Sequence, residues 1–277
     1  MEIEILICTI DERITHALQV PAEPCPGVTY LISWQQSHEG LCLPENFTPR
    51  EDVRLLTCKG RGLSANRNFA LEHARGDYLL IADDDEYFEI SHLVRAKEAF
   101  AQHPQTDIFL LQALTPEGQP FKPNYPAQPF NYAHCPRGYY PSSWEIALRR
   151  KTTSWLRFDI RFGLGSSHLA CGEEEVFLHE AYRQGLRIEY HPIPVATVPP
   201  GTTGSRFRES EAVRRSKGAV LTIMHGAPSA ALRCLKFALT LRHCSLRERC
   251  RYLADMWQGI LYIKKEPKAP SDQESRA

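Results

Sequence analysis

The sequence predicts an α/β protein with a mostly parallel sheet flanked by helices, followed by a helical C-terminal extension. Short apolar runs rich in β-branched residues alternate with helical patterns over residues 3–200. One run, Tyr78 to Ala82, is continuously apolar, as in a strand covered on both faces within a parallel sheet. From residue 205 onward the patterns are helical only.

Size and charge favour one catalytic-sized domain with an appendage. The chain has 277 residues, 43% of them hydrophobic, enough to bury one substantial core. The formal net charge of zero argues against a general nucleic-acid-binding protein. Residues 205–268 nevertheless carry 14 Lys and Arg against 5 Asp and Glu. We therefore expect a domain over 1–204, a basic helical extension over 205–268 and a disordered tail over 269–277.

Cysteine usage and hydropathy indicate a cytoplasmic protein. The nine cysteines are scattered and form no C-x-x-C pair, which is typical of reduced thiols. The first residues, MEIEILICTI, are too short and too acidic for a signal peptide, and no apolar run reaches the ~20 residues of a membrane span.

The first half of the chain reads as three strands, a helix and a fourth strand. The strands are expected over Ile3–Thr9, Val28–Trp34 and Val53–Cys58, between loops that contain Pro or Gly. Ser64 would cap the helix, and Gly76 would end it in a left-handed conformation before Tyr78 opens the next strand.

Three consecutive carboxylates, Asp83, Asp84 and Asp85, follow that fourth strand at once. Ligand sites of open α/β sheets lie at the carboxyl ends of the strands. Mutual repulsion of the three groups favours a cation, and Mg²⁺ or Mn²⁺ bridging to phosphate oxygens fits carboxylate ligands. The alternative is a solvated acidic turn.

Further elements continue the alternation. Ser91 would cap a helix that runs to His103, with Leu93 and Val94 on its buried side, and strands are expected over 106–113, 144–150 and 188–195. The segment 116–141 has seven prolines and six Phe and Tyr residues, which suits either an acceptor-binding loop or simple packing over the sheet.

A second carboxylate cluster, Glu173 to Glu175, opens a helix that Gly185 would end and whose apolar side would include Tyr182. Acidic residues are favoured in a first helical turn without any catalytic role. Three further helices are expected over 209–225, 228–243 and 245–265. The second is amphipathic and basic, so it would either lie on an anionic membrane surface or cover the sheet.

Three motifs resemble the family 2 glycosyltransferases, whose fold is the Rossmann-like GT-A. The central one comprises Gly62-Leu63-Ser64, Arg67-Asn68 and the aspartates at 83–85. The segment from Thr9 to Arg13 is similar to the family's opening motif. The run from Phe158 to Phe177, with Gly172-Glu173-Glu174, resembles the segment that carries the catalytic base.

This resemblance implies an inverting, metal-dependent transfer from a nucleotide-diphospho sugar, with UDP-sugars favoured, to a glycan or lipid-linked acceptor in surface polysaccharide synthesis. Glu174 would be the catalytic base, and Mn²⁺ or Mg²⁺ the cofactor, held by Asp85 and Asp83. The residues that would bind the donor are Thr9, Asp11, Arg67, Asp83 and Asp84.

The chain departs from the family pattern at two places. Trp34-Gln35-Gln36-Ser37 replaces an aspartate that contacts the nucleoside, so either Gln35 or Gln36 substitutes or base recognition differs. The slot of a metal-binding histidine holds Val198 or Pro199. His191 precedes that slot, and we expect it to be packed or exposed to solvent.

Two other classes of function remain open. A nucleotidyltransferase would share the sheet and the metal carboxylates, but it usually has a Gly-rich loop after the first strand, where this chain has Asp11-Glu12-Arg13. A catalytically silent protein that binds sugar nucleotides or acts as a scaffold would not need both carboxylate clusters.

Overall fold

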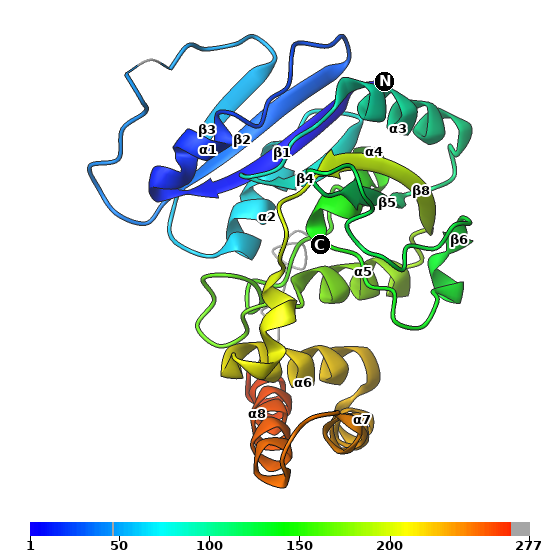
Figure 1. The fold of residues 1–277 in the computed structure, drawn as a ribbon. Helices are drawn as coiled ribbons and strands as arrows, with labels where there is room; N and C mark the ends of the chain where they lie inside the picture. Colours follow the sequence, from blue (N-terminus) through cyan, green and yellow to red (C-terminus); the bar gives the residue numbers. More distant parts are fainter. Residues whose placement is uncertain (46, 267–277) are drawn as a thin grey trace, which may run out of the picture. The chain divides into compact units, whose positions relative to one another are not determined.

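The computed structural model describes residues 1–45 and 47–266, so the predicted tail 269–277 lies outside the described residues (Figure 1). Contacts divide the chain into two compact units. The sheet unit comprises Met1–Phe158 and Phe177–Gly201, and the helical unit comprises Asp159–Val176 and the chain from Thr202 onward. Residues 159–176 therefore associate with the C-terminal helices, although they precede the last strand of the sheet in sequence.

Eight strands of the described chain form one sheet in the order β3-β2-β1-β4-β7-β5-β8-β6. The pairs β1–β2, β2–β3, β1–β4 and β5–β8 are parallel, whereas β7 is antiparallel to both β4 and β5, and β6 to β8. This confirms the predicted mostly parallel sheet. The strands are β1 Ile3–Ile10, β2 Val28–Gln36, β3 Val53–Lys59, β4 Tyr78–Asp83, β5 Ile108–Leu114, β6 Phe130–Asn131, β7 Ile146–Arg149 and β8 Ile188–Thr197.

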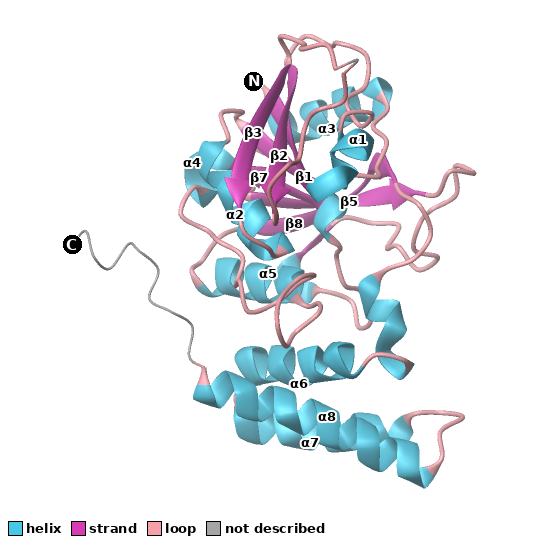
Figure 2. Ribbon diagram, turned by 90° about the vertical axis from the view of Figure 1, so that its left-hand side faces the viewer, coloured by secondary structure: helices cyan, strands magenta, loops and turns pink. Residues whose placement is uncertain are grey.

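Helices cover both faces of this sheet, and each face has its own apolar core (Figure 2). On one face α3 (Ile90–Gln102) buries Leu93 and Phe100. On the other, α2 (Leu63–His73) and α5 (Glu173–Arg183) bury Leu71 and Phe177. The remaining short elements are η1 Asp11–Arg13, α1 Ile14–Ala17, η2 Tyr132–His134, η3 Ser143–Glu145 and α4 Arg150–Thr153.

Two predicted caps of α2 are wrong. The N-cap is Gly62, with φ of 124°, and Ser64 lies inside the first turn. Ala74 ends the helix in an extended conformation, so no left-handed glycine is needed. Gly76 is required for another reason: a Cβ there would lie 2.6 Å from the Glu4 Cβ and 2.9 Å from the Glu4 backbone nitrogen.

Three smaller expectations also failed at helix surfaces. Glu89, not Ser91, is the N-cap of α3, because the helix begins two residues earlier than the serine-cap pattern predicts. Val94 and Tyr182 were expected on buried faces, but 43% and 45% of their surfaces are exposed. Gly185 does end α5, with φ of 83° and its N–H donating to the Tyr182 carbonyl.

The helical unit contains η4 (Thr203–Arg208) and three long helices, α6 (Glu211–His225), α7 (Ala227–Thr240) and α8 (Leu246–Lys265). These match the three predicted helices within a few residues. Serine side chains cap two of them: Ser210 accepts from the Val213 N–H, and Ser245 forms a capping box with Glu248. None of the described helices is long and apolar enough to cross a membrane.

Helices α6 and α8 approach each other closely through glycines. A Cβ on Gly218 of α6 would lie 1.9 Å from the Met256 carbonyl oxygen, and a Cβ on Gly259 of α8 would lie 1.9 Å from the Arg215 carbonyl oxygen. A buried ion pair crosses the same interface, since Arg214 Nε donates to Asp255 Oδ2 at 2.6 Å. The two helices are thus joined by backbone contact and one desolvated charge pair.

Candidate active site

The three aspartates lie at the carboxyl edge of the sheet, beside the end of β1. Asp83 is the last residue of β4, and it pairs in register with Cys8 of the parallel neighbour β1. The segment Thr9 to Arg13 therefore emerges next to Asp83–Asp85. Two motifs that are far apart in sequence are brought to one edge, where α/β sheets bind ligands.

Asp84, the middle carboxylate, is held entirely by protein groups. It is 6% exposed, and its Oδ2 accepts from the Thr9 hydroxyl at 2.6 Å. The Arg13 Nε lies 2.9 and 3.0 Å from the two carboxylate oxygens, and Arg13 Nη2 also pairs with Oδ1. Asp84 thus fixes the turn after β4 to the turn after β1.

Arg13 is the partner of Asp84, a role that the sequence analysis did not assign to it although Arg13 closes the Thr9–Arg13 motif. A desolvated carboxylate is costly without a partner, so the buried Asp84 requires a cation from the protein itself. That requirement was the available signal, and Arg13, 71 residues earlier in the chain, satisfies it.

Asp83 is anchored by Arg67 of α2. Arg67 is 2% exposed, and its Nη2 donates to Asp83 Oδ1 at 2.9 Å and to the Ser143 hydroxyl at 2.8 Å. Its guanidinium also lies 5.5 Å from the centre of the Phe158 ring. The side chain of Asp83 remains 27% exposed, so one oxygen can face a ligand.

Asp85 is the most open of the three, with 48% of its side chain exposed. Partial burial and the neighbouring Asp83 and Asp84 carboxylates raise its pKa, while Arg13 at 3.3 Å opposes the shift. A like-charge cluster with one open carboxylate is the environment that a hard divalent cation relieves. The residues present therefore fit an Mg²⁺ or Mn²⁺ site formed by Asp85 and Asp83.

Glu86 stabilises the turn that follows β4 through a hydrogen bond from the Asp83 backbone. It is fully buried, and its Oε1 accepts from the Asp83 N–H at 2.8 Å. Burial and the Asp83 charge raise the pKa of Glu86 well above its ordinary value. The raised pKa favours the neutral carboxyl, which holds the end of β4 without adding a fourth charge to the cluster.

Asp11 lies at the other side of the same edge, in a strained turn with φ of 49°. Its two carboxylate oxygens accept from the Ser37 N–H at 2.8 Å and from the Ser37 hydroxyl at 2.7 Å. Trp34 donates its indole N–H to the Asp11 carbonyl at 2.8 Å. The unusual segment after β2 is therefore bound to the turn that follows β1, with Gln35 buried and Gln36 half-buried.

The asparagines on either side of Arg67 fix the surrounding backbone. Asn66 donates to the Thr9 carbonyl at 2.8 Å, which ties α2 to the end of β1. Asn68 forms a reciprocal pair with Phe158, donating to its carbonyl at 2.9 Å and accepting from its N–H at 2.7 Å. The Arg-Asn motif thus positions both the aspartates and the segment that leads into Asp159.

The proline-rich loop is fastened by a buried ion pair. Lys122 Nζ lies 2.6 Å from Glu145 Oε2, and it also donates to the Tyr140 carbonyl at 2.7 Å. The Tyr125 hydroxyl donates to the other oxygen of Glu145. Burial raises the pKa of Glu145, and Lys122 opposes the shift.

Most aromatic residues of the loop pack on the protein. Phe130 stacks on Tyr190 of β8 with ring centres 4.8 Å apart, and Phe121 meets Trp144 edge to face. Tyr140 is the exception, with 53% of its surface exposed beside Lys122. Tyr140 therefore suits the interpretation of the segment as an acceptor-binding loop, whereas Phe121 and Phe130 suit simple packing over the sheet.

The second carboxylate cluster forms the first turn of α5 and belongs to the helical unit. Glu173 is buried, whereas Glu174 and Glu175 are half-buried. Gly172, with φ of 97°, precedes them, and a Cβ there would lie 2.5 Å from the Val220 side chain and 3.8 Å from Glu175 Oε2. Glu175 thus folds back over Gly172 within its own unit.

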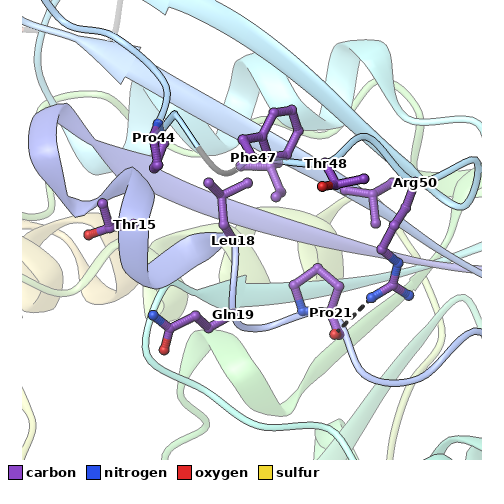
Figure 3. Close-up of a pocket in the computed structure, with 10 residues that line it drawn as sticks. Thr15, Leu18, Gln19, Pro21, Pro44, Phe47, Thr48 and Arg50 are labelled. Atoms are coloured by element: carbon purple, nitrogen blue, oxygen red, sulfur yellow. Dashed lines mark hydrogen bonds between the residues drawn. The ribbon is translucent and has the colours of Figure 1, made fainter.

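The slot expected for a metal-binding histidine contains Val198, which is 3% exposed and contributes no ligand atom. A pocket of about 410 Å³ lies elsewhere in the sheet unit, between α1 and the loop that precedes β3 (Figure 3). Leu18, Pro44 and Phe47 line it, and its Arg50 is engaged by Asp52 and by the Pro21 carbonyl. None of its lining residues belongs to the carboxylate clusters.

A mostly parallel sheet with clustered aspartates beside the ends of β1 and β4 is the arrangement expected of the GT-A fold. Residues 45–166 match the family model described as glycosyl transferase family 2. This is the family that the motifs of the sequence resemble, and the match covers less than half of the chain.

Solved structures of S. aureus TarS share the fold. The crystal structure of TarS has a TM-score of 0.57 and 18% identity, covering 94% of this chain and 49% of that one. The structure of TarS 1-349 in complex with UDP-GlcNAc has a TM-score of 0.57 and 15% identity, and the match covers 94% of this chain and 82% of that one. For TarS 1-349 in complex with UDP the TM-score is 0.53 and the identity 15%, with 94% of this chain and 81% of that one covered. The chain thus spans about half the length of TarS. No curated protein sequence matches it.

Proposed function

We propose that the protein is an inverting, metal-dependent glycosyltransferase that moves a sugar from a UDP-sugar to a hydroxyl of a glycan or lipid-linked acceptor, in surface polysaccharide synthesis. The observation that carries the proposal is the open Asp85 carboxylate beside Asp83 and the anchored Asp84. The UDP and UDP-GlcNAc complexes of TarS, which has the same fold, support a uridine donor.

Each residue at the sheet edge has a role in this proposal. Asp11 and Thr9 would lie near the nucleoside, and Arg67 keeps Asp83 in place. The ion pair between Asp84 and Arg13 would hold the turn after β4 in the conformation that leaves Asp85 exposed. A divalent cation held by Asp85 and Asp83 would neutralise charge on the departing diphosphate.

Glu174 is the proposed base. In an inverting transfer the acceptor oxygen bonds to the anomeric carbon as the bond from that carbon to the diphosphate oxygen breaks, and the hydroxyl proton passes to the base. Glu174 lies in the first turn of α5, where the helix dipole interacts favourably with negative charge. Burial of Glu173 and the folding of Glu175 over Gly172 support Glu174 as the acid that meets the acceptor.

The competing functions give different products. A nucleotidyltransferase would release pyrophosphate from a nucleoside triphosphate, and a silent binding protein would leave a UDP-sugar intact. The contacts of Arg13 argue against a nucleotidyltransferase, because the basic residue that follows β1 is already paired with Asp84. Release of UDP from a UDP-sugar, measured with and without acceptor, separates all three.

Metal-dependent binding of UDP is the direct test. At ~100 times its dissociation constant, UDP should stabilise the protein by about 2.7 kcal/mol in a thermal-shift assay, and only with Mn²⁺ or Mg²⁺ present. Asp85→Ala should abolish the metal-dependent part. Glu51→Ala, which removes an exposed carboxylate remote from the cluster in sequence, is the matched control. UDP binding that stays equally Mn²⁺-dependent in Asp85→Ala would disprove the assignment.

We also propose that the helical unit binds the cytoplasmic face of an anionic membrane through α7. Leu232, Leu235 and Leu239 recur at helical spacing and are 70%, 44% and 62% exposed. Arg233 and Lys236 flank this stripe, and with Leu221 and Phe237 they line a hollow of about 270 Å³. Apolar residues beside cations suit lipid with acidic head groups.

Liposome sedimentation tests this surface. The intact protein should bind vesicles that contain acidic phosphatidylglycerol, lose affinity as salt rises, and ignore neutral phosphatidylcholine vesicles. The double variant Leu232→Ser, Leu239→Ser should bind less while it retains its fold, since both side chains are exposed. Equal binding by the double variant, or none by the wild type, would leave α7 as a cover for its own unit.

A further inference from the structure

A cluster of two histidines and a glutamate lies at the other edge of the sheet. His103 follows the last residue of α3 as its C-cap, and Glu189 and His191 are alternate residues of β8. Alternate residues of a strand point to the same face. One ligand atom from each of the three side chains lies within 4.8 Å of the other two, and the two imidazole rings have centres 4.4 Å apart.

The position separates this cluster from the proposed donor site. Strands β4 and β5 are both antiparallel to β7 and hence parallel to each other, and β8 is parallel to β5. Asp83–Asp85 lie at the carboxyl end of β4, whereas Glu189 lies in the second position of β8. The two groups are therefore at opposite edges of the sheet, and one cation cannot serve both.

The glutamate is held with one oxygen directed at the histidines. Arg187 donates to Glu189 Oε1 from Nε at 2.8 Å. Buried Thr106 donates its hydroxyl to Oε2 at 2.5 Å. That same Oε2 lies 3.5 Å from His191 Nε2 and 4.0 Å from His103 Nδ1. Outer hydrogen bonds of this kind orient a carboxylate that binds metal.

His191 gives a second indication of a ligand, independent of the clustering of the three side chains. The residue is 5% exposed, and its buried Nε2 forms no hydrogen bond of normal geometry, since the Glu189 Oε2 that faces it is 3.5 Å away. A buried polar atom of this kind is costly unless something satisfies it. His103 is more open, with 43% of its side chain exposed, so the cluster is accessible from its side.

We propose that His103, Glu189 and His191 form a binding site for Zn²⁺, separate from the donor site. Zn²⁺ accepts two imidazoles and a carboxylate with a further position for water. Tetrahedral bonds of about 2.1 Å place ligand atoms about 3.4 Å apart. The 3.5 Å pair already meets this spacing, and the 4.0 Å pair needs only a small turn of the exposed His103 ring. The bound ion would join the end of α3 to the start of β8.

Metal binding can be measured without any activity assay. Protein stripped with EDTA should take up one Zn²⁺ in competition with a chromophoric chelator, and Co²⁺ in its place should give the visible absorption of a four-coordinate site. His103→Ala should weaken Zn²⁺ binding by more than ~100-fold, beyond the ~10–100-fold expected for Thr106→Val, which removes only an outer hydrogen bond. His103 is exposed enough for its variant to fold, and His191→Ala provides a second test.

Two controls make the result decisive. His134→Ala removes an exposed histidine from the proline-rich loop and should leave Zn²⁺ affinity unchanged. Asp85→Ala removes the proposed donor-site ligand and should leave the Co²⁺ spectrum unchanged, so failure of the proposed transferase function would not affect this outcome. The proposal is overturned if His103→Ala and His191→Ala bind Zn²⁺ like the wild type, or if Asp85→Ala alone abolishes binding.

Discussion

The contact between α6 and α8 makes a strong prediction about Gly218. Replacing it with alanine adds one methyl group, whose carbon would lie 1.9 Å from the Met256 carbonyl oxygen and 2.7 Å from the carbonyl carbon. Carbon atoms of real side chains essentially never come within 3.0 Å of such atoms, and here the neighbour is helix backbone, which cannot rotate away. The helices must therefore separate by about 1 Å.

Two effects of opposite sign determine the size of the change. Alanine favours a helix over glycine by about 1 kcal/mol. Against this, forced separation strains the interface by ~1–3 kcal/mol and sometimes more. A gap of 0.5–1 Å also forfeits about a quarter to a half of the dispersion energy of the buried contacts around Met256 and Ile260. We expect a net loss of about 2 kcal/mol from the free energy of opening the helical unit.

Hydrogen exchange with mass spectrometry resolves this unit within the full chain. Peptides from 211–225 and 246–265 should lose protection in Gly218→Ala, and Gly259→Ala should show the same loss, because its Cβ would meet the Arg215 carbonyl oxygen at 1.9 Å. Gly204→Ala is the matched control, since nothing lies within 4 Å of a Cβ there. Unchanged or increased protection in Gly218→Ala would refute the close approach of the two helices.

Two further predictions concern the carboxylates. Glu174→Gln should keep UDP affinity near that of the wild type and lower turnover by ~10²–10⁴-fold, whereas normal transfer by Glu174→Gln together with loss in Glu175→Gln would shift the base by one residue. Lys122→Met should destabilise the protein by ~3–5 kcal/mol at neutral pH, because Glu145 is left buried without its cation. Burial already raises the pKa of Glu145, and its folded form therefore retains a proton where the unfolded chain loses it. The penalty in Lys122→Met should shrink as the pH falls toward the ordinary pKa of glutamate, and urea titrations showing a pH-independent penalty would contradict this.

Strands and long helices could be predicted because the apolar pattern of each segment is a local property of the sequence. The caps of α2 were not, since Gly76 is fixed by the approach of Glu4 from β1, and a local rule for helix ends cannot register that contact. Glu89 shows the same limit at α3, where the N-cap has no side-chain cap hydrogen bond and therefore does not follow the serine-cap pattern.

The site divides along similar lines. Asp83–Asp85 could be found because they directly follow a buried strand, and the family motif gave their neighbours. The pairing of Arg13 with Asp84 depends on β1 lying beside β4, and the meeting of His103 with Glu189 depends on α3 ending near β8. Both are facts of topology that no short window of sequence contains.

The Lys122–Glu145 pair has a consequence for engineering the proline-rich loop. Lys122 lies within the loop, whereas Glu145 lies in η3, just before β7. If this loop were replaced by one from another protein, Glu145 would remain buried without a cation unless the new loop placed a lysine at the position of Lys122. Exchange of this segment should succeed only when Lys122 and Glu145 are replaced together, so the segment to exchange extends from Thr115 through Glu145.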